Sequence, residues 1–303
     1  MGTQPLIIEC RCNETAYRGA NPHLPYSPDE IVREAVRAWE AGAAIFHWHG
    51  RNPQSGVPQN DLELYLQVYE GIRAHTDLII HPTLGYITQP RVEDRVRHIL
   101  AVQDDPRLRV DMVPVDFGSL NVDYWNPVER RFTTTDQVYV NTRANLEAVL
   151  RVFQQHHLFV AAVCWDVGQI RTARCFQAMG LVSERTLWEF VFTGETMPTG
   201  TPVTLPSLQS MIAEVPTGQP WLVLCWNGDV LPVAAWAITL GGHVAIGLGD
   251  YAYSRFGTPH NGELVARVAA MAETLGRPLA TPGQARALLG IPDRPELPRR
   301  STQ

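Results

Sequence analysis

The sequence predicts an α/β fold, a (β/α)8 TIM barrel, and three observations support it. Short apolar runs typical of strands alternate with amphipathic helical stretches, about eight such units can be counted, and their spacing is even. A doubly wound open sheet is the alternative fold. No GxGxxG or Walker-type loop follows the first strand, so a dinucleotide site lacks support. One barrel domain is expected over residues 1–290, and a tail rich in proline and arginine over 291–303.

Each expected strand is a short apolar run, and an amphipathic stretch separates it from the next. The strands are expected at residues 6–12, 44–49, 78–82, 112–116, 159–165, 187–193, 221–226 and 243–248. After the first helix, further helices are expected near 62–75, 89–102, 143–156, 167–179, 205–214, 230–240 and 262–275. Thr281-Pro282-Gly283-Gln284 then opens a short terminal helix.

The first helix has the clearest start signal. Ser27 is expected to be the N-cap, Pro28 occupies the first helical position, and Glu30 completes a capping box. Gly42 is expected to end the helix. Its buried stripe is expected to consist of Ile31, Ala35 and Ala38.

The composition is that of an ordinary globular protein, with 303 residues of which 45% are hydrophobic and 18% are charged. A net charge of −6 and the lack of an arginine-rich face argue against a nucleic-acid partner. No apolar run follows a basic start, and Pro232, Gly241 and Gly242 interrupt the long uncharged span over 230–249. We therefore expect a cytoplasmic protein without a membrane partner.

The chain contains no lysine, because all 25 basic residues are arginine. Carbon-carbon cleavage through a Schiff base needs a lysine amine, and a carbamylated-lysine metal bridge needs one too. Both mechanisms are excluded. A carbanion or enolate formed by this chain would have to be stabilised by a metal, backbone amides or arginine.

His47 and His49 are the most informative residues. On a strand, side chains two residues apart project from the same face, so these imidazoles can bind one metal ion, while Phe46 and Trp48 point the other way. The segment follows a capped helix and precedes a loop with proline and glycine. It predicts a cation at the carboxyl end of the second strand; the alternative is a hydrogen-bonded histidine pair near a barrel rim.

Polar residues also follow the other expected strands, where the catalytic residues of a barrel belong. They are Glu14, His81, Thr83, Ser119, Asn121, Asp166, Thr193, Asn227, Asp229 and Asp250. Each alone is typical of a loop or cap, but their joint placement around one barrel mouth predicts a functional site.

The chain resembles the beta-keto acid cleavage enzyme family, the 3-keto-5-aminohexanoate cleavage enzyme-like proteins, over nearly its whole length. The resemblance rests on Asn13-Glu14-Thr15, the segment 21–30, Ala41-Gly42-Ala43, His47-Trp48-His49-Gly50-Arg51, Thr83 with Gly85, Gly118-Ser119-Leu120-Asn121, Gly241-Gly242-His243-Val244, the segment 261–265 and Leu279-Ala280-Thr281-Pro282.

This resemblance implies a zinc-dependent barrel, or one using another divalent metal, that exchanges acyl groups between a β-keto acid and acetyl-CoA. The products would be acetoacetate and a new CoA thioester. It also suggests a homo-oligomer, a tetramer. His47 and His49 would carry the metal, which polarises the keto oxygen. Asp250 would handle protons and Glu14 would orient the substrate. The substrate's carboxylate and keto group would be held by Thr83, Gly85, Ser119 and Asn121.

Three positions depart from the family pattern. Gly249 stands where the family has a third metal ligand, glutamate, Ala245 where it has an arginine, and Pro82 where it has a substrate-binding serine. Zinc in a catalytic site usually has three protein ligands. The third ligand is therefore expected to be Asp250, whose carboxylate the loss of that arginine would free, or else His81 or Glu14.

Two other functions remain open. A metal-dependent hydrolase also fits a His-x-His pair in a barrel, although such enzymes usually place the pair on strand one and often use a lysine. A degenerate barrel that binds a keto acid or metal without turnover would explain Gly249 and Ala245.

Overall fold

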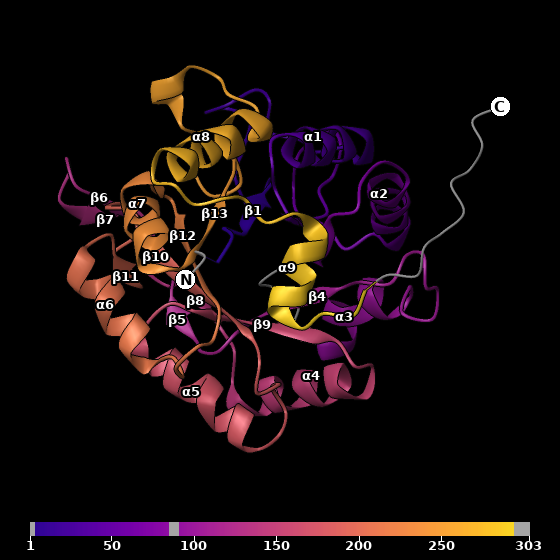
Figure 1. Ribbon diagram of the computed structural model, residues 1–303. Coiled ribbons are helices and arrows are strands. Elements are labelled where there is room, and N and C mark those ends of the chain that lie inside the picture. The colour runs from indigo at the N-terminus through magenta and orange to yellow at the C-terminus, as the bar shows by residue number, and fades with distance from the viewer. Residues whose placement is uncertain (1–3, 85–90, 294–303) are drawn as a thin grey trace.

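Eight parallel strands form the barrel in the computed structural model, which describes residues 4–84 and 91–293 (Figure 1). The strands are β1 (Ile8–Arg11), β2 (Ile45–Trp48), β3 (Ile79–Pro82), β4 (Met112–Asp116), β9 (Phe159–Cys164), β10 (Leu187–Thr193), β12 (Trp221–Trp226) and β13 (His243–Ile246). Every one lies within or matches a predicted strand. The short β11 (Thr201–Pro202) pairs with the end of β10.

The strands follow one another around the ring in chain order. Hydrogen-bonded neighbours run β3-β2-β1-β13-β12-β10-β9-β4. The gap between β3 and β4 is bridged by Ile80, whose carbonyl accepts a hydrogen bond from the Asp111 amide at 3.3 Å and whose amide donates to the Asp111 carboxylate at 2.8 Å. The predicted barrel is thus confirmed, and the open sheet is excluded.

Helices surround the strands (Figure 1). They are α1 (Pro28–Glu40), α2 (Leu62–His75), α3 (Val92–Leu100), α4 (Arg143–Gln155), α5 (Val167–Ala178), α6 (Leu205–Glu214), α7 (Leu231–Leu240), α8 (Asn261–Thr274) and α9 (Pro282–Leu289). The capping box predicted at Ser27 and Glu30 is present, and Ile31, Ala35 and Ala38 are buried. A single 3-10 turn, Ser254–Phe256, precedes α8.

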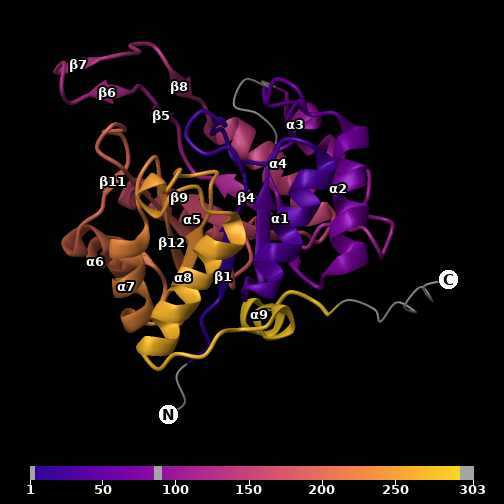
Figure 2. The same ribbon diagram turned by 90° about the horizontal axis from the view of Figure 1, so that it is seen from above.

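The terminal helix α9 covers the amino end of the barrel (Figure 2). Leu289 of α9 and Ile291 behind it pack with Ile45 and Ile79, which point inward from the lower parts of β2 and β3. Ile291 lies one residue past the predicted domain boundary at 290. Because this end is filled with apolar side chains, the polar residues of the interior lie toward the carboxyl end.

The alternation predicted for the second strand is confirmed. Phe46 and Trp48 belong to the layer between strands and helices, where the Trp48 ring contacts Tyr69 of α2 with centroids 5.4 Å apart. His47 lies between them in sequence and therefore points into the barrel.

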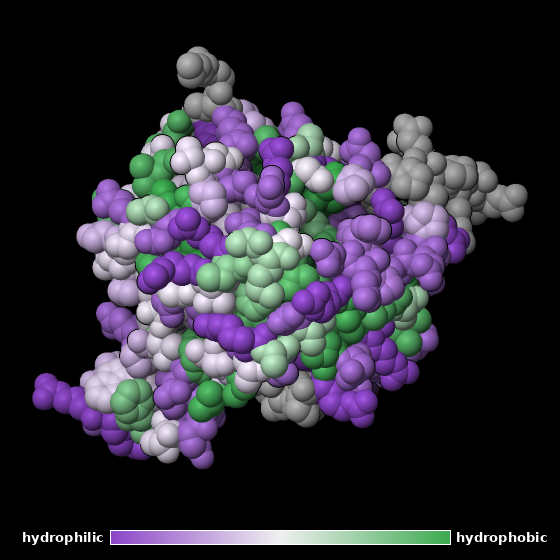
Figure 3. Space-filling model, turned by 90° about the horizontal axis from the view of Figure 1, so that it is seen from below, coloured by the Kyte–Doolittle hydropathy of each residue, from purple (hydrophilic) through white to green (hydrophobic). Residues whose placement is uncertain are grey.

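An insertion between β4 and α4 extends beyond the carboxyl end of the barrel (Figure 2). It contains β5 (Leu120–Asn121) paired with β8 (Val138–Tyr139), and β6 (Trp125–Asn126) paired with β7 (Arg131–Phe132). The hairpin of β6 and β7 projects from the molecule (Figure 3). Val128, which lies between these two strands, has 90% of its surface exposed. Nowhere in 4–84 or 91–293 is a helix both long and apolar enough to cross a membrane.

Candidate active site

A pocket opens at the carboxyl end of the barrel, as the polar strand ends predicted. Its walls come from all sides of the mouth: Arg11, Glu14, Thr15, His47, His49, Thr83, Leu84, Pro114, Asp116, Val122, Tyr139, Val163, Trp165, Val191, Leu224, Trp226 and Asp250.

Glu14, His47 and His49 converge at one side of this pocket, and we call them the Glu14 cluster. The Glu14 Oε1 atom lies 2.9 Å from His47 Nε2, and Glu14 Oε2 lies 2.7 Å from His49 Nε2. One ligand atom from each residue lies within 4.8 Å of the others, a spacing that can hold a metal ion. Of the three proposed third ligands, Glu14 is therefore the one that the fold brings to both histidines.

Backbone contacts hold this cluster in place. Glu14 has a φ of +28°, an uncommon value for a residue with a side chain. The buried Arg51 guanidinium donates hydrogen bonds to the carbonyls of Asn13, Glu14 and Ala16. The Asn13 amide group exchanges two hydrogen bonds with the backbone of His49, at 2.8 and 3.1 Å. These contacts join the loop after β1 to the end of β2.

Gly249 gives Glu14 its space. A Cβ atom at position 249 would lie 2.5 Å from Glu14 Cγ and 2.7 Å from the Glu14 amide nitrogen, which is too close for either to stay in place. The family resemblance implies a glutamate at this position. Here position 249 is a glycine, and the Glu14 side chain fills the space between β1 and the end of β13 that a side chain at 249 would need.

Asp250 is paired with Arg11, so the expectation that its carboxylate is free is wrong. The Arg11 Nε atom lies 3.2 Å from Asp250 Oδ2, and Arg11 also contacts Glu14 at 2.7 Å and Glu9 at 3.2 Å. Ala245 is the register partner of Glu9 on β1, two residues before Arg11. Arg11 of β1 thus places a guanidinium beside Asp250, where the resemblance implies an arginine at position 245.

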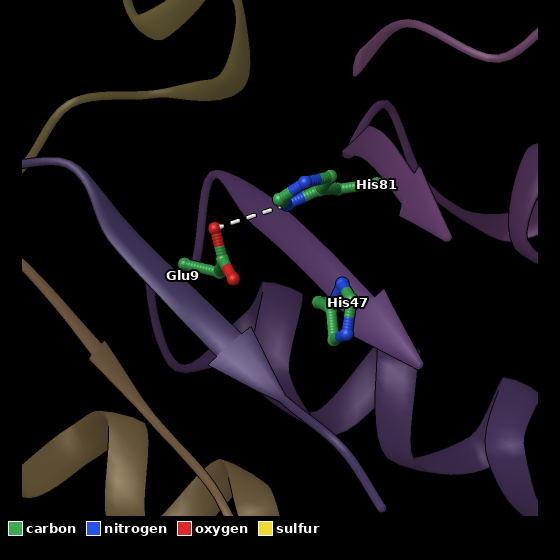
Figure 4. Close-up of side chains that lie close together, drawn as sticks. All are labelled: Glu9, His47 and His81. Atoms are coloured by element: carbon green, nitrogen blue, oxygen red, sulfur yellow. Dashed lines mark hydrogen bonds and ion pairs between the residues drawn. The ribbon is translucent and has the colours of Figure 1, made fainter. Parts of the chain in front are cut away.

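His81 is the register partner of His47 on β3, but it is fully buried and does not line the pocket. Its Nδ1 atom is 3.3 Å from Glu9 Oε2 (Figure 4). The same atom is 3.8 Å from Glu189 Oε1. Glu9, His47 and His81 form a second group whose ligand atoms lie within 4.8 Å of one another. This group shares His47, which lines the pocket, with the Glu14 cluster, and all three of its residues are buried.

Three charged residues that were not predicted as site residues share this buried region: Glu9, Arg11 and Glu189. Each is a charged residue in an otherwise apolar strand, and Glu9 and Arg11 are two apart and so face the same way. Charged residues are rarely buried unless they are paired. That pattern was the available signal for a polar barrel interior.

The charges in this region shift the pKa values of their neighbours. Burial raises the pKa of Glu14, but the charge of Arg11, together with the adjacent His47 and His49, outweighs it and holds that pKa well below the usual value. Burial lowers the pKa of His47 to about 4, so its imidazole is neutral, the form that binds metals. Burial, with the Glu14 carboxylate nearby, raises the pKa of Asp250 to about 8 despite Arg11.

The four predicted substrate-binding residues are placed differently. Thr83 lines the pocket. Asn121 is an exposed residue of β5, and the Ser119 hydroxyl accepts a hydrogen bond from the Asn141 amide at 2.7 Å; neither lines the pocket. Gly85 lies outside the described residues.

Similarity to known proteins identifies the family. A family model described as beta-keto acid cleavage enzyme matches residues 5–291. The chain belongs to this family. It is 29% identical over 289 residues to the 3-keto-5-aminohexanoate cleavage enzyme of Acetoanaerobium sticklandii, covering 94% of this chain and 98% of that protein. It is 30% identical over 294 residues to the 3-oxoadipate:acetyl-CoA acetyltransferase of Cupriavidus necator, covering 96% of each.

Solved structures support the fold of this family member. The apo structure of ObcA superposes with a TM-score of 0.69 at 15% identity, covering 89% of this chain and 66% of that chain. The predicted family and the barrel are both confirmed. The family is enzymatic, and three of its curated members carry acetyl-CoA in their names.

Proposed function

We propose that this protein transfers the acyl group of a β-keto acid to coenzyme A, using acetyl-CoA and a divalent metal ion. The bond between C2 and C3 of the keto acid breaks, and C2 forms a new bond to the acetyl carbonyl carbon. The CoA sulfur exchanges its acetyl group for the departing acyl group. The products are acetoacetate and a new CoA thioester. Family membership supports the reaction, and the Glu14 cluster supports the site.

The residues of the Glu14 cluster fit a metal ion such as zinc. Both ring nitrogens of His47 are buried and neither makes an aligned hydrogen bond within the described chain, and Glu14 Oε1, which Arg11 contacts at 2.7 Å, lies 2.9 Å from His47 Nε2. Two neutral imidazoles and one carboxylate are a common ligand set for catalytic zinc. His47, His49 and Glu14 would hold the ion. When bound, it would polarise the keto oxygen as a Lewis acid.

Arg11 and Asp250 are proposed to manage charge and protons beside this cluster. Asp250 lines the pocket and is held by Arg11 at 3.2 Å, so its carboxyl group keeps one orientation. We assign to it the removal of the C2 proton, which must leave before C2 can attack the acetyl carbonyl. Thr83 lines the same pocket and is proposed to contact the substrate through its hydroxyl group.

A direct experiment tests the reaction and the metal together. The protein is purified without a polyhistidine tag and its metal content is measured, with about one zinc ion per chain expected. It is then incubated with acetyl-CoA and a panel of β-keto acids, and acetoacetate is quantified. Acetoacetate formed in step with a new CoA thioester supports the proposal. Keto acid consumed without thioester formation indicates hydrolysis, and binding without consumption indicates a barrel without turnover.

The His47→Ala/His49→Ala double variant tests the site itself. It should lose the metal and nearly all activity. The matched control is His75→Ala/His156→Ala, which removes two exposed imidazoles at the ends of α2 and α4. Activity that persists in the first variant at the level of the control would reject metal catalysis at this cluster.

A further inference from the structure

The wall of the pocket across from β1 contains one carboxylate among aromatic rings. We call Asp116, Tyr139, Trp165 and Trp226 the Asp116 wall; all four line the pocket. Trp165 directly follows β9, which is four strands from β1 in the ring of eight and so lies across the barrel from it. A molecule bound to the Glu14 cluster at one end would therefore reach this wall with its other end.

The Asp116 carboxylate is held in a fixed orientation. Trp165 Nε1 donates a hydrogen bond to Oδ1 at 2.7 Å, and the Tyr139 hydroxyl donates one to Oδ2 at 2.7 Å. Two donors favour the ionised form, and each oxygen keeps a second lone pair for another partner. Trp165 also meets Trp226 edge to face, with ring centroids 5.3 Å apart. The wall thus joins a negative charge to aromatic surfaces.

No cation of the described chain forms an ion pair with Asp116. The Arg95 guanidinium is near enough for its charge to lower the pKa of Asp116, but it donates to the Leu84 carbonyl and to Asn141 instead. Arg11, which also lines the pocket, is shared among Glu9, Glu14, Glu189 and Asp250. Burial raises the pKa of Asp116 overall, as expected for a carboxylate without a counter-ion.

We propose that the β-keto acid used by this protein has a positively charged side chain, an ammonium or quaternary ammonium group, that binds at the Asp116 wall. This inference rests on the proposed function. A cation would supply the missing counter-charge of Asp116 and would contact the faces of Trp165 and Trp226. A carboxylate at the same end of the substrate would be repelled by Asp116, and a neutral group would desolvate Asp116 without compensation.

The substrate test uses three β-keto acids of equal length that differ in their last group: trimethylammonium, the isosteric tert-butyl, or carboxylate. With acetyl-CoA in excess, kcat/KM should be at least about tenfold higher for trimethylammonium than for tert-butyl, and lowest for carboxylate. A tert-butyl or carboxylate substrate used equally well or better overturns the inference while leaving the proposed reaction intact.

A binding measurement separates the inference from the reaction. Calorimetric titration compares 4-(trimethylammonio)butanoate with 5,5-dimethylhexanoate, its uncharged isostere, on the metal-loaded protein. Tighter binding of the cation by at least about tenfold is expected, whether or not any keto acid is turned over. Equal binding overturns the charge preference. If the cation binds more tightly but no keto acid of the panel reacts, the proposed reaction is what fails.

Asp116→Asn identifies the residue responsible. It should reduce the preference for trimethylammonium over tert-butyl, taken as the ratio of their kcat/KM values, to near unity. Asp77→Asn is the matched control, because Asp77 also accepts a hydrogen bond from a tryptophan, Trp39 Nε1, at 2.6 Å, but lies outside the pocket. Tyr139→Phe is a second, milder variant, which keeps the ring and removes one donor. An unchanged preference in Asp116→Asn overturns the assignment.

Discussion

Glu14 and Gly249 occupy one region between them, because a Cβ at position 249 would lie 2.5 Å from Glu14 Cγ. The absence of a side chain on the β13 side is what lets the loop after β1 place a carboxylate against both imidazoles. The proposed ligand set would therefore take its carboxylate from the loop after β1 rather than from position 249.

Gly249→Ala should weaken metal binding. The added methyl group meets the Glu14 backbone nitrogen as well as its side chain, so the loop must move and the carboxylate leaves both histidines. Zinc affinity, measured against a competing chelator, should fall by about tenfold or more. The control is Gly283→Ala, where nothing lies within 4 Å of the new methyl group. Equal zinc affinity in both variants would show that Glu14 is no ligand.

A glutamate introduced at position 249 should restore part of the zinc affinity that Glu14→Ala removes. Gly249 has no left-handed φ, and Glu14→Ala removes the Cγ atom that a Cβ at position 249 would meet at 2.5 Å. The backbone nitrogen and Cβ of residue 14, at 2.7 and 2.9 Å, still require the loop to shift. Glu14→Ala/Gly249→Glu is expected to bind zinc more tightly than Glu14→Ala alone, by about tenfold. The same chelator competition measures it. A double variant no better than the single one would contradict the idea of a shared region.

Acid should destabilise the fold through two buried histidines outside the Glu14 cluster. Burial lowers the pKa of His98 to about 4 and that of His243 to about 3. Below about pH 6.5 the unfolded chain binds protons that the folded chain excludes, so the free energy of unfolding falls as the pH falls. Each histidine contributes up to about 1.4 kcal/mol per pH unit until its folded pKa is reached.

Urea denaturation between about pH 7 and pH 5 measures this dependence. His243→Asn should reduce the slope, because asparagine does not bind a proton in this pH range. The variant should still fold, because the Asn side-chain carbonyl can accept the hydrogen bond that His243 Nδ1 takes from the Ile7 amide at 3.0 Å. Asp250, whose pKa is raised to about 8, contributes in the opposite direction over this range but is present in both proteins. An equal slope in His243→Asn and the unaltered protein would therefore be inconsistent with a neutral, buried imidazole at position 243.

Removing the apolar contact beneath the barrel should separate stability from catalysis. Leu289→Ala deletes a fully buried side chain of α9 and should lower the free energy of unfolding by about 2–4 kcal/mol. Leu288→Ala, at a half-buried position of the same helix, should cost less. Below the melting transition, both should keep the kcat of the unaltered protein, because α9 lies at the end opposite the pocket. A selective loss of kcat in Leu289→Ala would contradict this.

The strands and helices could be predicted because their signals are local. The apolar run with alternating faces placed His47 inward, and the capping box placed the start of α1. The insertion over 117–142 was not predicted, because its strands are two residues long and have no measurable periodicity. Its hairpins are defined by the pairing of β5 with β8 and of β6 with β7, and the pattern of apolar residues does not reveal these pairings.

Part of the lining of the candidate site could be predicted, because the ends of the strands can be located from local signals. His47, His49, Glu14, Thr83 and Asp250 all line the pocket, as expected of residues at strand ends. The pairing of Asp250 with Arg11 could not be predicted, because it depends on the register between β1 and β13 and on the reach of a long side chain. Pairings across strands that are distant in sequence require the three-dimensional structure.

The helix α9 covers one end of the barrel, and this has a kinetic consequence. The keto acid, acetyl-CoA, acetoacetate and the new thioester would all have to enter and leave through the remaining opening. Departing thioester and arriving acetyl-CoA would then compete for the same passage, so turnover should slow as the product thioester accumulates, even when the keto acid is abundant. Exchange of the product thioester for acetyl-CoA, rather than bond cleavage alone, would then limit the turnover rate in a cell.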